Sequence, residues 1–120
     1  MKNKQVKLLK RLLEIPSATG TEAAVAALVR AHAADAADEV DTDVMGSVHA
    51  RLKGSGAGPS LMLSAHMDEI GLMVTYISDD GFLSVAAVGG VDAAILPGLR
   101  VDVHASNAFE PLRGVVGRKP

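Results

Sequence analysis

A short apolar segment, residues 61–65, constrains the fold more than any other feature of this sequence. Its residues, Leu61-Met62-Leu63-Ser64-Ala65, do not alternate with charged ones, and a Gly- and Ser-rich stretch at 54–60 precedes them. A strand with apolar side chains on both faces has to be covered on both faces, as in the sheets of α/β proteins. The sequence therefore predicts a buried strand over 61–65, near the centre of the sheet of an α/β fold.

An amphipathic helix is predicted over residues 2–14. Val6, Leu9 and Leu13 recur there at helical spacing, and most of the lysines lie elsewhere on the helix surface. Pro16 follows and ends the helix. The pattern favours a helix that docks on the protein and exposes its lysines over one that lies on a membrane.

A second helix is predicted after a short loop. Thr19 and Glu22 have the spacing of a capping box ahead of an Ala-rich stretch that runs to about residue 34. The acidic residues of 35–43 then indicate a solvated connection, since they lack the regular ligand spacing of a calcium loop. Alternating residues at 48–52 predict a strand with one exposed face.

The sequence after Gly71 is rich in strand signals and has no room for a full-length helix. Four strand-like segments are separated by Gly-, Pro- and Asp-containing turns. We therefore expect an α/β part over residues 1–70 and an all-β part over 71–120. The four predicted strands are 72–77, 82–88, 99–105 and 113–116.

The composition excludes several classes of protein. A hydrophobic content of 48% predicts an ample core, but Tyr76, Phe82 and Phe109 are the only aromatic residues. The near balance of 12 basic and 14 acidic residues, together with so few stacking rings, argues against nucleic-acid binding. No segment resembles a signal peptide or reaches the ~20 apolar residues that span a membrane, so we expect a cytoplasmic protein with no membrane partner.

Because there is no cysteine, any metal has to be bound by histidines and carboxylates. His66 and Asp68 follow the predicted buried strand, and residues two apart in an extended segment point the same way. Asp68 could then accept the N–H of a metal-bound His66 and fix the orientation of its ring. Two residues are a short motif, and a buried histidine beside a locally paired aspartate explains them as well. His32, His49 and His104 are predicted to be surface residues.

The sequence around His66 and Asp68 resembles that of a known protein family. The segment Ser64-Ala65-His66-Met67-Asp68-Glu69-Ile70-Gly71 closely resembles the first metal-ligand motif of the M42 metallo-aminopeptidases, a family whose members have also been called cellulases. Ser47 stands where the family typically has Asn. Further segments resemble the family in the same order, namely 16–22, 43–48, 80–83, 88–90, 96–101 and 114–120.

The resemblance implies a function for the pair. His66 would bind one of two divalent metal ions, zinc or cobalt, and Asp68 would be its orienting partner in the catalytic site. A metal-activated water would then cleave the first peptide bond of a short peptide. The family's general base lies in a Glu-Glu pair, which is absent here, and the other ligands have no counterpart, so this chain holds at most one metal ligand.

The resemblance also implies an architecture. Residues 1–70 would begin a zinc-peptidase-like α/β catalytic domain, and residues 71–120 would be part of an inserted, barrel-like all-β domain that carries dimer contacts. We expect the full-length protein to be a homo-oligomeric aminopeptidase, and the 120 residues to be inactive by themselves.

Two other functions are weighed against this one. The chain could be a noncatalytic self-association module with a vestigial metal site. A carbohydrate hydrolase fits less well, because such enzymes typically use two carboxylates across a sugar site, and aromatic sugar platforms are scarce here.

Overall fold

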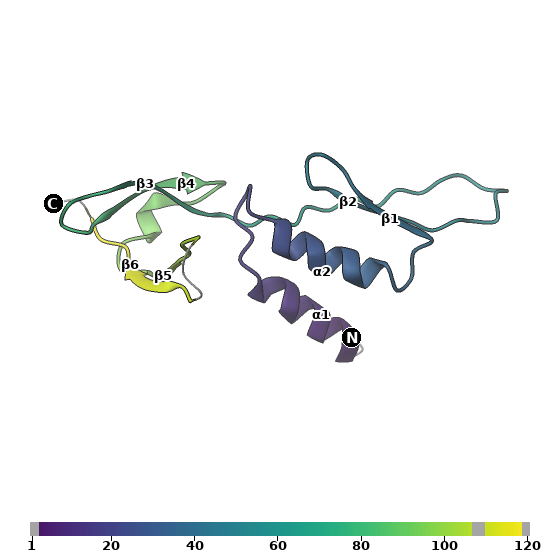
Figure 1. Ribbon diagram of the computed structural model, residues 1–120, viewed down its shortest axis with the longest axis horizontal. Helices are drawn as coiled ribbons and strands as arrows, with labels where there is room; N and C mark the ends of the chain where they lie inside the picture. The colour runs from purple at the N-terminus through teal and green to yellow at the C-terminus, as the bar shows by residue number, and fades with distance from the viewer. Residues whose placement is uncertain (1–2, 107–109, 119–120) are drawn as a thin grey trace. The chain divides into compact units, whose positions relative to one another are not determined.

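The computed structural model describes residues 3–106 and 110–118, and Figure 1 shows their helices and strands. The chain divides into two compact units, the first ending at Gly89 and the second beginning at Gly90. Helices and strands together make an α/β structure, as predicted. Phe109, one of the three aromatic residues, lies outside the described part.

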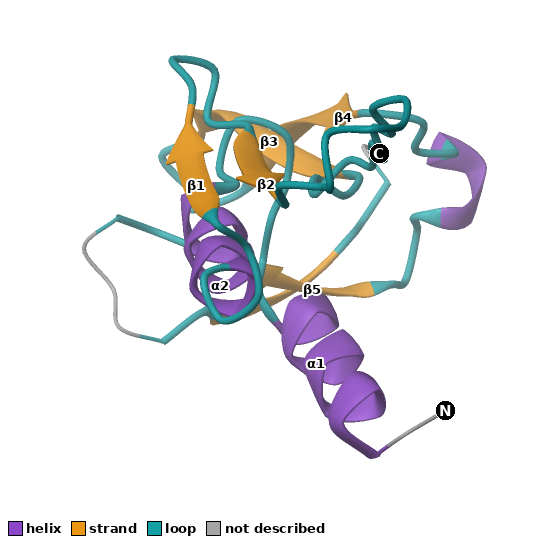
Figure 2. Ribbon diagram, turned by 90° about the vertical axis from the view of Figure 1, so that its right-hand side faces the viewer, coloured by secondary structure: helices purple, strands orange, loops and turns teal. Residues whose placement is uncertain are grey.

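The two predicted helices are confirmed. α1 spans Asn3–Glu14 and α2 spans Ala23–Ala33. α2 packs on the following β-hairpin (Figure 2), and its Arg30 Nη1 donates to Thr42 Oγ1 at 2.9 Å. Neither helix in the described residues is long and apolar enough to cross a membrane.

The predicted capping box is wrong. Glu22 stands just before α2, and its side chain makes no cap hydrogen bond to the helix. Its Oε1 instead accepts from the backbone N–H of Gly20 at 2.7 Å, which closes the turn before the helix. The Thr19 hydroxyl donates to Asp68, a residue 49 positions later, at 2.7 Å. A partner supplied by the tertiary structure has replaced the local one.

The acidic connection predicted at 35–43 contains a strand. β1 (Glu39–Thr42) pairs antiparallel with β2 (Val48–Arg51). The exposed acidic side chains of β1 lie opposite basic side chains of β2. Arg51 Nη1 is 3.2 Å from Glu39 Oε2, and His49 Nδ1 is 3.2 Å from Asp41 Oδ2. Basic residues opposite the acidic ones avoid like-charge repulsion across the pair, and the backbone pairing with β2 then orders this acidic segment.

The turn of this hairpin is held by Asp43. Its Oδ1 accepts the backbone N–H groups of Met45 and Ser47, each at 2.9 Å. Gly46 adopts φ +88°, a left-handed conformation that glycine tolerates at no steric cost. The hydrogen bond from Ser47, with a smaller contribution from Met45, holds the pKa of the Asp43 carboxyl below its usual range.

The buried strand predicted at 61–65 is wrong. This segment forms no strand, and Leu61, Met62 and Leu63 are 86%, 86% and 88% exposed. A central strand needs a hydrogen-bonded neighbour on each side and a covering layer on each face. Among the described residues the strands pair as three separate hairpins, and none of them pairs with 61–65.

The four strands predicted after Gly71 are confirmed. β3 (Gly71–Ile77) pairs with β4 (Leu83–Val88) in the first unit, with an irregularity between Val74 and Tyr76. In the second unit β5 (Arg100–Val103) pairs with β6 (Leu112–Val115), and a single turn of 3-10 helix, η1 (Ala93–Ile95), precedes them. The barrel-like insert and the domain boundary at residue 70 stay predictions.

The ample core expected from composition is not formed by the described residues. Only Val25 and Ala26, both in α2, are buried apolar residues there. None of the strand residues in the three hairpins is fully buried, because a two-stranded sheet needs a further layer to cover its apolar side chains.

Gly89 follows β4 and is sensitive to a side chain for two reasons. Its φ is +78°, and a Cβ there would lie 2.9 Å from Ile70 Cγ2. We expect Gly89→Ala to lower the free energy of unfolding by at least about 1 kcal/mol in urea denaturation, because the left-handed conformation alone costs that much. Gly90→Ala is the matched control, since a Cβ at Gly90 meets no described atom within 4 Å. Equal effects of the two substitutions would show that neither the backbone conformation of Gly89 nor its contact with Ile70 restricts a side chain there.

Asp43 makes the stability of the hairpin depend on pH. Because its pKa is lowered in the folded chain from the ordinary value of 3.8, its contribution is complete above that value and is lost as the pH falls through the folded-state pKa. We expect Asp43→Asn to lose less stability than the wild type between about pH 6 and about pH 2.5, measured by urea denaturation. Asp80→Asn is the control. The Asp80 carboxylate lies in a turn and has no hydrogen bond to a described residue, so this variant should show the same dependence of stability on pH as the wild type.

Candidate functional site

The loop between α1 and α2 lies beside the segment that leads into β3. Ala18 and Glu69 form a parallel bridge there. Glu69 binds Ser17 twice, because its backbone N–H donates to Ser17 O at 2.9 Å and its Oε1 accepts from Ser17 N at 3.1 Å. Ser17 is only 4% exposed. These bonds hold residues 17–19 against residues 68–69.

The close approach of the two segments depends on small residues. A Cβ at Gly71 would lie 3.0 Å from the Ala18 Cβ, which is tighter than most such contacts. The small residues Ala18 and Gly71 therefore allow the two backbones to approach closely, and the polar contacts are made by the residues next to them.

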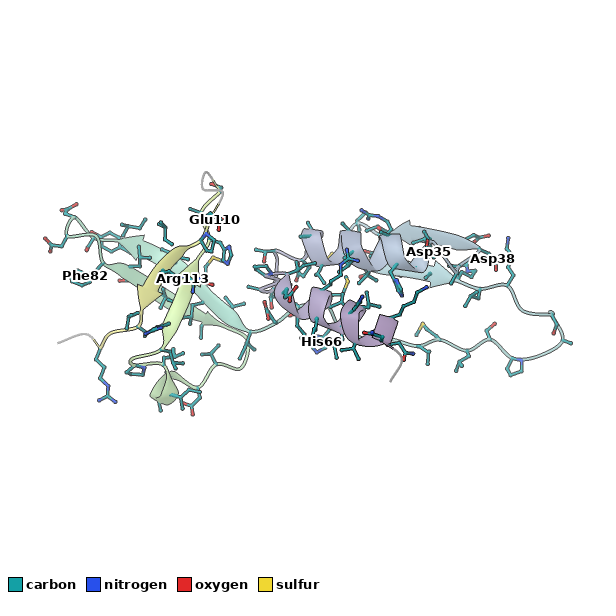
Figure 3. All side chains as sticks on the ribbon, turned by 90° about the horizontal axis from the view of Figure 1, so that it is seen from below. Asp35, Asp38, His66, Phe82, Glu110 and Arg113 are labelled. Carbon is teal, nitrogen blue, oxygen red and sulfur yellow. The ribbon has the colours of Figure 1, made fainter. Side chains whose placement is uncertain are left out.

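His66 and Asp68 make the contact that the sequence predicts. His66 Nδ1 lies 3.0 Å from Asp68 Oδ1 and 3.0 Å from the Asp68 backbone oxygen. Both partners are acceptors, so Nδ1 carries the proton and the lone pair of a neutral ring lies on Nε2. Among the described residues nothing is bonded to Nε2, and the His66 side chain, labelled in Figure 3, is 85% exposed. The ring thus presents a free ligating nitrogen to solvent.

Thr19 completes this arrangement, and sequence reasoning missed it. Its hydroxyl donates to Asp68 Oδ2 at 2.7 Å, so the two carboxylate oxygens have separate partners. The hydrogen bond from Thr19, followed by that from His66, lowers the pKa of the Asp68 carboxyl, because both bonds favour its charged form. The capping-box spacing suggested a local partner for Thr19, and no local pattern points to residue 68.

The other three histidines lie at the surface, as predicted. His32 and His104 are exposed, and His49 contacts the carboxylates of Asp41 and Asp43 on the outer face of the β1–β2 hairpin. In the described part of the chain no group of three or more His, Asp or Glu side chains could hold a metal ion. The described residues thus supply no complete set of metal ligands.

Known aminopeptidases are similar to this chain in sequence. A family model described as M42 glutamyl aminopeptidase matches residues 46–120. The lysyl aminopeptidase of Pyrococcus furiosus is 46% identical over 85 residues, which cover 70% of this chain and 24% of that protein.

Solved structures share the fold as well as the sequence. An aminopeptidase from the archaeon Desulfurococcus kamchatkensis superposes with a TM-score of 0.89 at 38% identity, covering 98% of this chain and 32% of that one. The Pyrococcus horikoshii TET1 peptidase matches with a TM-score of 0.77 at 34% identity, covering 96% of this chain and 33% of that one. That peptidase can assemble into a tetrahedron or a large octahedral shell. The chain spans about a quarter to a third of the length of these relatives.

The bonds between Ser17 and Glu69 can be tested by substitution. Glu69→Ala removes the acceptor of the Ser17 N–H and should lower the free energy of unfolding by about 1–3 kcal/mol, because that donor is left without its partner. Glu69→Gln keeps an acceptor oxygen and should cost less than half as much. Urea denaturation of the wild type and the two variants measures the difference. A wild-type free energy of unfolding in Glu69→Ala would show that the side-chain bond to Ser17 contributes nothing to stability.

Proposed function

This chain belongs to the M42 glutamyl aminopeptidase family, and we propose that it supplies one corner of the metal site of an aminopeptidase that removes N-terminal residues from short peptides. The observation that carries the proposal is the free Nε2 of His66, on a ring whose Nδ1–H is held by Asp68 at 3.0 Å. This pair lies in the part of the chain that the family model matches. Its exposure leaves room for a metal and for the groups that complete the site.

The roles of the two residues follow from their chemistry. His66 would bind one of two divalent ions, zinc or cobalt, through Nε2. Asp68 would act as a catalytic-site partner that keeps the proton on Nδ1 and makes Nε2 more basic. When bound, such ions polarise a peptide carbonyl and acidify a bound water.

The remaining catalytic groups would lie outside these 120 residues. A catalytic zinc typically has about three protein ligands and one open position, and the described residues include no such group. The relatives are three to four times as long as the matched segments. The 120-residue chain alone is therefore expected to bind metal weakly and to hydrolyse no peptide.

We also propose how the whole protein is organised. Residues 1–70 would begin the catalytic domain, and residues 71–120 would be the first part of an inserted, barrel-like β-domain that mediates homo-oligomer formation. The assembly of the TET1 peptidase supports the oligomer. A cytoplasmic location stays a prediction.

His66→Ala in the whole protein tests the metal role. We expect the metal content, measured by atomic emission, to fall and aminopeptidase activity on aminoacyl substrates to drop at least about 100-fold, because a ligand is lost. His49→Ala changes an exposed histidine outside the pair and should leave both unchanged.

The same variants separate the proposed enzyme from a noncatalytic self-association module. If His66→Ala leaves metal content, activity and oligomer size at their wild-type values, the site is vestigial and the module is the better description. Turnover by the isolated 120-residue chain with two tightly bound metals would contradict the proposal that other segments complete the site.

A further inference from the structure

The ring of His66 has little besides hydrogen bonds to orient it. Its side chain is 85% exposed, so packing contributes little to its position. Asp68, which is 33% exposed on the side chain, accepts the Nδ1–H through Oδ1. A carboxylate held at one oxygen only can rotate about its terminal bond, because that torsion is broad. Nδ1 also lies 3.0 Å from the Asp68 backbone oxygen, so the orientation of His66 depends on that oxygen and on what holds the second oxygen of the Asp68 carboxylate.

Thr19 holds that second oxygen. Its Oγ1 donates to Asp68 Oδ2 at 2.7 Å, a length typical of a strong hydrogen bond from a hydroxyl to a charged acceptor. Thr is β-branched and has few χ1 rotamers, so its hydroxyl is better fixed than that of a flexible side chain. Oδ1 faces His66 and Oδ2 faces Thr19, which together define the plane of the carboxylate.

The backbone of Thr19 is itself held on both sides. Before it, Ala18 forms the parallel bridge with Glu69. After it, the Thr21 hydroxyl and N–H both donate to Ala18 O, at 2.6 and 2.8 Å, and close the turn. The loop therefore presents the Thr19 hydroxyl from a fixed position to a residue 49 positions away.

We propose that Thr19 is a positioning residue: through its hydrogen bond to Asp68 Oδ2 it orients the carboxylate that keeps His66 in the Nδ1–H tautomer with Nε2 available to a metal. The inference rests on the proposed function, since the purpose of a free Nε2 is metal binding. Thr19 touches neither substrate nor metal in this scheme, and it acts through Asp68.

The tautomer of His66 is a direct readout that needs no metal. In the 120-residue protein, ¹⁵N NMR of the imidazole should show mainly the Nδ1–H form. Thr19→Val keeps the branched shape and removes the hydroxyl, so we expect a shift toward the Nε2–H form that imidazole favours in water. Thr19→Ser restores the hydroxyl and should give the wild-type spectrum.

Two further variants control for damage to the loop. Thr21→Val removes the neighbouring hydroxyl, which binds Ala18 O and not Asp68, and should leave the His66 tautomer unchanged. Thr19→Ala gives a second test of the missing hydroxyl if Thr19→Val does not fold. An unchanged tautomer in a folded Thr19→Val or Thr19→Ala protein would overturn the proposal.

Metal affinity in the whole protein separates this proposal from the proposed function. Titration with Zn²⁺ should show a roughly 10- to 100-fold weaker affinity for Thr19→Val, the effect of losing an outer partner of a ligand, and a near wild-type affinity for Thr19→Ser. Weaker affinity in His66→Ala with wild-type affinity in Thr19→Val would overturn the role of Thr19 alone. Wild-type affinity in His66→Ala would overturn the proposed function itself, and with it the metal-binding purpose given to Thr19.

Discussion

The pairing of Ser17 with Glu69 is the interaction on which the candidate site depends. Two hydrogen bonds, at 2.9 and 3.1 Å, and the adjacent parallel bridge join segments that lie about fifty residues apart in the chain. Without this pairing, nothing in the described residues would bring Thr19 to Asp68. The small residues Ala18 and Gly71 permit it, because a larger side chain at either position would separate the backbones.

Polar contacts of this kind organise the first unit more than a hydrophobic core does. Its buried apolar residues are confined to α2, whereas its turns are closed by short hydrogen bonds that Asp43 and Glu22 accept and that Thr21 donates. Exposed ion pairs contribute little stability individually, so the β1–β2 hairpin relies on its backbone pairing, its Asp43 turn and α2. The apolar side chains left exposed, such as Leu61 and Met62, mark surfaces that a further layer would cover.

Most local elements could be predicted from sequence because their determinants lie close together in the chain. Helical spacing predicted α1, an Ala-rich stretch after a loop predicted α2, and strand segments bounded by turn residues predicted β3 to β6. β1 was missed because its acidic residues resemble a solvated connection until the basic residues of β2 lie opposite them. The segment 61–65 was misassigned because an apolar strand is defined by neighbours and covering layers, which its own residues do not specify.

The sequence by itself determined that His66 and Asp68 meet, because two residues on one extended segment need no other part of the fold to come into contact. It also carried the ordered motifs that indicate the M42 family. Only the tertiary structure decided that Thr19 binds the far oxygen of Asp68 and does not cap α2. The reason is physical: a cap requires the Thr19 oxygen to lie where it can accept a backbone N–H of the helix, and the fold instead places this hydroxyl against the Asp68 carboxylate, to which it donates.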